Sequence, residues 1–362
     1  MSLLTHLVER LRDDASAAVH VVCTGAGAGL QQLLWSVPGA SSFLVGASFQ
    51  YAESAIDDYL GFTPERYGSE ATAMDLASVA FMHAGAGRNA VGIAVTASVA
   101  SLRPHRGPHR IHVASVSTGA SFLYYAELER ASGNAARDSD GERADHLGLV
   151  ALLDAVGHPS DAVAPLVGPF TRTSAVELGR ERFFARPLWR ATGAREPLPE
   201  KVALAFPGTF DPPHEGHLGM AAAVKRMTGD DPVFWVTAEP PHKPKVPFTD
   251  LLRRARLLRG NDVLFTHGEP LYLDKARRYP GCHFVIGTDA LVRMLDPRWG
   301  PAVDALVDEF RRLGTRFYVT SRVMDGTLVT LHDLADAPRD LCVEVPGRWD
   351  ISSSEIRRSS PP

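Results

Sequence analysis

Between residues 202 and 345, short apolar runs alternate regularly with amphipathic segments. The apolar runs have the length and composition of strands, and the segments between them carry apolar residues at helical spacing. This alternation predicts a Rossmann-like, doubly wound parallel sheet with helices on both faces. Ligands of such sheets bind outside the carboxyl ends of the strands, so we expect a site there. The predicted strands are 202–206, 232–238, 262–267, 282–287, 315–321 and 341–345.

The first half of the chain alternates in a similar but less regular way. An apolar run leads through a Gly/Ala-rich turn into a helical pattern, and later segments repeat the change of period. The predicted strands are 19–23, 41–51, 90–99 and 110–117, and the predicted helices are 70–85, 122–132 and 142–156. We therefore predict two α/β domains, residues 1–160 and 200–362, joined by a Pro/Gly-rich linker with a helical middle at 161–199.

Charge and cysteine content narrow the function classes. Lys and Arg together number 38, and Asp and Glu together number 42, so the formal charge is −4. The chain as a whole therefore lacks the net positive charge that favours binding to nucleic acid. The three cysteines lie far apart, so neither a disulfide framework nor a structural zinc site is expected. No apolar run is long enough to span a membrane, and the first residues do not form a signal peptide. We expect a cytoplasmic protein.

The segment 207–224, PGTFDPPHEGHLGMAAAV, carries the chemistry of the second half. Gly208 follows the first strand where backbone must come close to a ligand, and His214 and His217 stand at the mouth of a helix. Helix N-termini attract phosphate through free N–H groups and the helix dipole, and two imidazoles add donors. The pattern predicts an anion site. A plain surface helix start or a metal-binding pair of histidines are the alternatives.

This segment resembles the HxGH signature of the nucleotidylyltransferase superfamily. Three later segments match in order: EPPHKPK at 239–245, FVIGTDALVRMLDPRWG at 284–300 and WDISSSEIRR at 349–358. Together they resemble the nicotinate and nicotinamide mononucleotide adenylyltransferases. The resemblance implies the nucleotidylyltransferase fold and the transfer of AMP from ATP to a pyridine mononucleotide, with release of pyrophosphate and with Mg²⁺ bound through the ATP phosphates.

The resemblance also assigns roles to residues. His214 and His217 contact the phosphates, Lys243 and Arg357 act as cationic clamps, and Asp289 contacts ribose or shapes the site. Trp299 stacks on the pyridine ring. The remaining implied ATP- and substrate-binding residues are Gly208, Thr209, Phe210, Gly287, Ser352, Ser353 and Ser354. Lys243 as a solvated loop lysine, Trp299 as a core residue and Asp289 as a helix N-cap are the structural alternatives.

Two other functions stay open at this point. One is a non-catalytic nucleotide-binding regulator, and the other is nucleotidylyl transfer to a different phosphate, such as phosphopantetheine. The sequence does not choose between nicotinate and nicotinamide mononucleotide as the acceptor.

Residues 1–160 resemble, more weakly, the CinA C-terminal domain family of nicotinamide mononucleotide deamidases. PGASSF and YGSEATAMDLA match that family's pattern, and alignment on them assigns its site to Thr24, Tyr51 and Thr96. Ile56 stands where the family has a lysine, so Thr24 lacks the base that a hydroxyl nucleophile needs. An inactive deamidase-like domain, a modified active amidohydrolase and a fortuitous resemblance are the three interpretations. Because members of that family form homo-oligomers, the resemblance suggests a homo-oligomer here.

Overall fold

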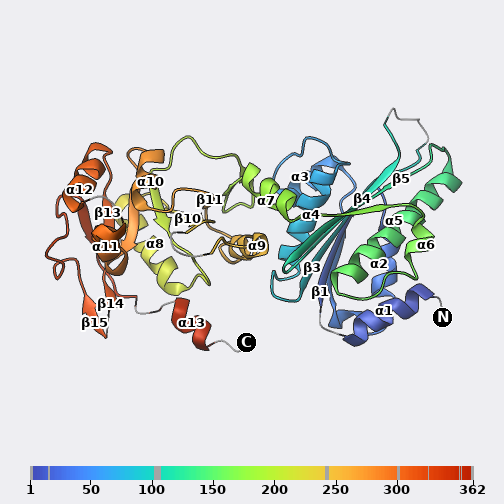
Figure 1. Ribbon diagram of the computed structural model, residues 1–362, viewed down its shortest axis with the longest axis horizontal. Coiled ribbons are helices and arrows are strands. Elements are labelled where there is room, and N and C mark those ends of the chain that lie inside the picture. Colours follow the sequence, from blue (N-terminus) through green and yellow to red (C-terminus); the bar gives the residue numbers. More distant parts are fainter. Residues whose placement is uncertain are drawn as a thin grey trace. The chain divides into compact units, whose positions relative to one another are not determined.

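The computed structural model describes residues 3–14, 17–101, 107–240, 244–299, 302–324, 326–349, 351 and 353–359 (Figure 1). The chain folds into two compact units. The first comprises residues 1–185 with 247–256, and the second comprises residues 186–246 with 257–362. Helix α9 (Phe248–Leu257), although it follows a strand of the second sheet in sequence, thus belongs almost entirely to the first unit.

The first unit is built on a six-stranded mixed sheet of order β2-β1-β3-β4-β5-β6. The first three strands run parallel, and the last three continue the sheet antiparallel. The strands are β1 (Ala18–Thr24), β2 (Leu44–Phe49), β3 (Ala90–Ser98), β4 (Arg110–Ser117), β5 (Ala120–Glu127) and β6 (Thr171–Ser174).

Helices cover both faces of this sheet. Buried residues of α1, α2 and α5 form one core with alternate residues of β1 and β3, while α4 packs along β3 and β4 on the opposite face. The helices of this unit besides α9 are α1 (Leu3–Asp14), α2 (Ala28–Trp35), α3 (Glu53–Leu60), α4 (Glu70–His83), α5 (Asn134–Ala155), α6 (Ala164–Val167) and α7 (Val176–Ala185), with a 3₁₀ turn at Ala40–Ser42. The predicted helix at 70–85 is confirmed.

The predicted helix at 122–132 is wrong, because residues 120–127 form strand β5. Aromatic and apolar side chains dominate this segment, and its backbone pairs with β4 along its whole length and with β6 on the other side. Cross-strand pairing of such side chains outweighs a local helical pattern. Helix α5 begins further on, at Asn134.

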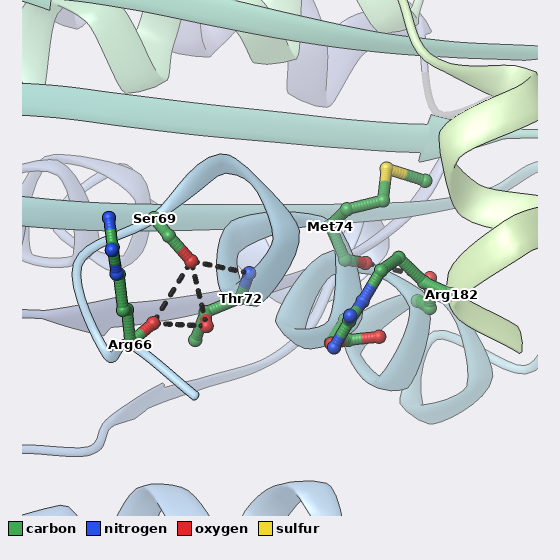
Figure 2. Close-up of polar contacts among 7 residues, drawn as sticks. Arg66, Ser69, Thr72, Met74 and Arg182 are labelled. Atoms are coloured by element: carbon green, nitrogen blue, oxygen red, sulfur yellow. Dashed lines mark hydrogen bonds and ion pairs between the residues drawn. The ribbon is translucent and has the colours of Figure 1, made fainter. Parts of the chain in front are cut away.

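Side-chain capping fixes the start of α4, as Figure 2 shows. The Ser69 hydroxyl accepts a hydrogen bond from the Thr72 backbone N–H at 3.2 Å and donates to the Arg66 carbonyl at 2.9 Å. The Thr72 hydroxyl donates to the same carbonyl at 2.6 Å. One orphan N–H of the helix is thereby satisfied. Further along α4, Asp75 forms a 2.7 Å ion pair with Arg182 of α7.

The second unit holds an eight-stranded sheet of order β16-β13-β12-β9-β10-β11-β7-β8. Its six strands from β16 to β11 are parallel, which confirms the doubly wound sheet, and the short β7 and β8 add an antiparallel edge. The strands are β7 (Leu188–Trp189), β8 (Arg195–Glu196), β9 (Leu204–Pro207), β10 (Val233–Thr237), β11 (Val263–Thr266), β12 (His283–Gly287), β13 (Phe317–Thr320) and β16 (Cys342–Val345).

The chain reverses its direction of winding between β9 and β12. From β9 it proceeds through β10 to β11, then returns to place β12 on the other side of β9 and continues to β13 and β16. The crevice at such a switch point is the expected ligand site. The remaining elements are α8 (Glu215–Thr228), α10 (Tyr272–Arg278), α11 (Thr288–Leu295), α12 (Val303–Arg312), α13 (Ser353–Ser359), a 3₁₀ turn at Pro297–Trp299 and the ribbon β14 (Arg322–Met324) and β15 (Thr327–Val329).

Candidate functional site

The loop after β9 is shaped by one glycine and one ring. Phe210 adopts a left-handed backbone conformation, with φ of 47°, and its side chain is buried. A Cβ on Gly208 would lie 2.7 Å from the Phe210 ring, so only glycine fits there. Thr209 lies between them, and the loop leads directly into the two histidines.

His214 and His217 lie together at the start of α8. His214 is the N-cap residue, and the His217 Nδ1 accepts a hydrogen bond from the His214 backbone N–H at 3.3 Å. The two rings stack with centroids 3.7 Å apart, and Phe210 packs edge-on against His217 at 4.9 Å. Because its Nδ1 accepts, a neutral His217 carries its proton on Nε2, where it can donate to a ligand.

Both imidazoles are neutral at physiological pH. Burial lowers the pKa of His217 to about 3, with further contributions from His214 and from the Arg322 guanidinium. Burial and Arg322 likewise lower the pKa of His214. The pair therefore offers N–H donors without fixed charge, and an arriving phosphate would favour protonation of either ring.

The lowered pKa values predict a pH-dependent stability. An unfolded histidine titrates near 6.5, whereas folded His217 titrates near 3, so between these values the unfolded chain binds more protons. The free energy of unfolding should therefore decrease as pH falls from 6.5 toward 3. His217→Phe should remove part of this dependence, measured as the difference between urea midpoints at pH 7 and pH 4.5. If the difference between the two midpoints is the same in His217→Phe as in the parent, the lowered pKa of His217 is contradicted.

The other side of this site, which we call the crevice because it lies at the switch point of the sheet, begins at the end of β12. Gly287 leads into α11, where the Asp289 carboxylate pairs with Arg293 at 2.8 Å and lies 3.8 Å from the Arg322 Nε. A Cβ on Gly287 would lie 2.5 Å from the Asp289 Oδ1 and 2.8 Å from the Arg322 Cγ. The glycine therefore allows the aspartate and the arginine to pack over the strand end.

Helix α13 returns to the histidine loop from the far end of the chain. The Ser353 hydroxyl donates to the Pro212 carbonyl at 2.9 Å, and Arg357 donates to the Asp211 carbonyl. The structure thus brings Ser353 and Arg357 to the loop that carries His214 and His217. This proximity is what a single binding site for all four residues requires.

Four of the predicted site residues are described only in part or not at all. Lys243 and Ser352 are outside the described residues, and only the backbones of Trp299 and Ser354 are described, in the 3₁₀ turn Pro297–Trp299 and in α13.

Two residues of the crevice were not singled out from the sequence. Arg322 lies beside the histidines, and Trp349 packs on the glycine face of α8, where a Cβ on Gly219 would lie 2.2 Å from its Nε1. Gly216 and Gly219, three residues apart, mark a helix face that another group approaches, and this spacing was the available signal. For Arg322 the sequence offers only its place after a predicted strand.

The predicted residues of the first half lie on neighbouring strands. Thr24 and Thr96 are register partners at the carboxyl ends of β1 and β3, and both are buried. Tyr51 follows β2 and is 69% exposed. The N-terminus of α2, which follows β1, is occupied by the protein itself, because the Leu30 N–H donates to the Asp145 carboxylate at 2.9 Å.

A family model described as cytidylyltransferase-like matches residues 205–359, which contain every element of the crevice. A probable nicotinate-nucleotide adenylyltransferase of Solibacter usitatus is 34% identical over 179 residues, 44% of this chain and 86% of that protein. The chain belongs to the nicotinate-nucleotide adenylyltransferase family. Its relative from Symbiobacterium thermophilum, a probable enzyme of the same name, is 31% identical over 42% of this chain and 79% of the relative. The second half is therefore a nucleotidyltransferase domain.

The first half has its own likeness among solved structures. A competence-damaged protein (CinA) superfamily protein from Enterobacter cloacae covers 43% of this chain and 94% of its own, with 20% identity and a TM-score of 0.35.

Among the described residues, no group of three or more His, Cys, Asp or Glu side chains is arranged to hold a metal ion. None of the described helices is both long and apolar enough to cross a membrane.

Proposed function

We propose that residues 200–362 transfer the adenylyl group of ATP to nicotinate mononucleotide or nicotinamide mononucleotide. The observation that carries this proposal is the stacked, neutral histidine pair at the N-terminus of α8, beside the switch point of the sheet. Such a pair, backed by helix dipole and free N–H groups, binds phosphate and can gain protons as charge builds up.

In this reaction a phosphate oxygen of the mononucleotide attacks the α-phosphorus of ATP. The bond from the α-phosphorus to the bridging oxygen breaks, and its electron pair leaves with pyrophosphate. The protein aligns the two phosphates and offsets their charge. His214 and His217 donate to the transferring group, while Arg357, held against the Asp211 carbonyl, and Lys243 contact the triphosphate.

The acceptor is recognised from the β12 side of the crevice. We propose that Asp289 contacts its ribose and that Trp299 stacks on its pyridine ring, and that Ser352, Ser353 and Ser354 contribute to the ATP side. The names of the relatives favour the nicotinate form. The choice between acid and amide rests on contacts to one substituent of the ring.

Magnesium is proposed to arrive with ATP. The side chains of the crevice offer mainly N–H donors and ring nitrogens, whereas Mg²⁺ prefers oxygen ligands, and the Asp289 carboxylate is paired with Arg293. These side chains do not fit a magnesium site of their own. Carried by the triphosphate oxygens, the ion would offset phosphate charge.

For residues 1–160 we propose a deamidase-like domain that lacks activity and serves structure or assembly, with 161–199 as its connection. Thr24 has no lysine partner, because a buried isoleucine, Ile56, stands where the resemblance to the deamidase family expects the lysine. The imidazole that the register places in the same row belongs to His112, opposite Thr96 on β4. With β3 between them, the backbones of Thr24 and His112 are about 10 Å apart. The Asp145 carboxylate at the start of α2 disfavours a phosphate there.

The experiment that tests this function measures pyrophosphate release from ATP with Mg²⁺ and one acceptor at a time. Nicotinate mononucleotide, nicotinamide mononucleotide and phosphopantetheine are compared, and the product is identified by chromatography. A dinucleotide from a pyridine mononucleotide supports the proposal. ATP binding without product favours the nucleotide-binding regulator, and product from phosphopantetheine alone favours the other transferase. Conversion of amide to acid in the same samples would overturn an inactive first half.

A further inference from the structure

Arg322 is held in the crevice by its backbone and by its side chain. It begins β14, just after the carboxyl end of β13, and its backbone N–H donates to the Thr288 hydroxyl at 3.1 Å. That hydroxyl donates in turn to the Val329 carbonyl of β15 at 3.1 Å. The fully buried Thr288 therefore fixes the base of the ribbon against the start of α11.

The Arg322 side chain is directed along the strand end toward the histidines. Its methylene groups pass over Gly287, and its Nη1 donates to the Trp349 carbonyl at 3.0 Å. Its Nε lies 3.8 Å from the Asp289 carboxylate. Only 19% of the side chain is exposed. The guanidinium is thus a pre-organised cation whose position is set by three elements.

Most donors of this guanidinium are unused within the described part of the chain. A guanidinium carries five N–H donors, and the bond to Trp349 is the one side-chain hydrogen bond that Arg322 makes among the described residues. The cation also lies close enough to both His214 and His217 to disfavour their protonation. A charge held beside a pair of neutral donors, with spare N–H groups, is suited to a phosphate dianion.

Two arginines lie near the histidine pair. Arg357 contacts the histidine loop at the Asp211 carbonyl, whereas Arg322 lies with Asp289 at the end of β12 and donates to the Trp349 carbonyl. An in-line transfer has two phosphates to hold, the triphosphate and the attacking phosphate. One arginine for each phosphate would meet this need.

We propose that Arg322 binds the phosphate monoester of the acceptor mononucleotide and orients it for attack. This inference rests on the proposed adenylyl transfer. Arg322→Gln should raise the KM for nicotinate mononucleotide at least about 10-fold, because one charge-assisted phosphate contact is lost, and should leave the KM for ATP within about twofold. Arg322→Lys keeps the charge without the fork and should be intermediate. Methylguanidinium in solution should partly restore Arg322→Gln.

Arg293→Gln is the matched control. Arg293 also pairs with Asp289, but its side chain is 68% exposed, whereas that of Arg322 is largely buried. Both KM values of this variant should stay within about threefold of the parent. Equal rises in Arg293→Gln and Arg322→Gln would mean that the loss acts through Asp289, which would overturn the proposal.

A second readout does not depend on turnover. Calorimetric binding of nicotinate mononucleotide, without ATP, should weaken at least about 10-fold in Arg322→Gln and stay within about threefold of the parent in Arg293→Gln. If Arg322→Gln does not fold, the same two measurements on Arg322→Lys decide. A parent protein that makes no dinucleotide refutes the proposed function. An active parent with unchanged acceptor KM in the variants, or with a raised ATP KM instead, refutes the role of Arg322.

Discussion

Replacing His217 by alanine is expected to lower turnover by about 10²-fold or more. The imidazole is held by the His214 backbone N–H, by stacking on His214 and by the Phe210 ring, so its Nε2–H is aimed before substrate arrives. A donor fixed in this way stabilises charge that develops on the transferring phosphate, and water admitted by the smaller side chain cannot reproduce its position. The effect should appear in kcat more than in either KM.

The matched control for this variant is His332→Asn. His332 belongs to the same unit, is 82% exposed, lies 3.3 Å from Glu344 and, within the described part of the chain, forms no hydrogen bond or ion pair with His214, His217, Arg322 or Asp289. Its kcat should equal that of the parent. A His217→Ala protein that folds and turns over at a near-normal rate would exclude His217 from stabilising the transfer.

The second large effect concerns stability. Gly92→Ala should destabilise the first unit by about 3 kcal/mol, at the upper end of typical overpacking costs. Gly92 lies in β3 under α4, and a Cβ there would lie 2.2 Å from the Phe81 backbone nitrogen and 2.3 Å from the Ala77 carbonyl oxygen. Backbone atoms cannot rotate away as a side chain can, so α4 must move away from the sheet.

Hydrogen exchange measures this change within the unit itself. Amides of β3 and β4 should lose protection in Gly92→Ala, with those of β9 as an internal reference. Gly141→Ala is the control, because Gly141 lies within α5 and, apart from the helix's own backbone, no atom of the described residues lies within 4 Å of the new methyl group. It should raise stability by about 0.5–1 kcal/mol. Unchanged β3 protection in Gly92→Ala would contradict the close packing of α4.

The parallel sheet of the second unit could be predicted because its information is local. Each strand is a short apolar run, and each helix has its own amphipathic face, so the alternation alone specifies the architecture. The first unit was harder to predict at β5, where residues 122–127 fit a helical period. Their state is decided by β4 and β6, and β6 lies more than 40 residues away in sequence.

The candidate site divides in the same way. His214 and His217 could be identified because motif, strand end and helix start are adjacent in sequence. Arg322 and Trp349 could not, because their importance depends on contacts with Gly287, Asp289 and the face of α8, which are distant in the chain. In the first half, strand register places Thr24 beside Thr96. Register does not identify a base that could activate either hydroxyl.

The measurement that tests the central claim most directly follows a label through the reaction. ATP labelled at the α-phosphorus is incubated with Mg²⁺, nicotinate mononucleotide and the 362-residue chain, and the products are separated. The proposed transfer predicts that the label appears in a pyridine dinucleotide, with one unlabelled pyrophosphate released for each. Label that remains in ATP, or that appears only as AMP, would contradict adenylyl transfer to a pyridine mononucleotide.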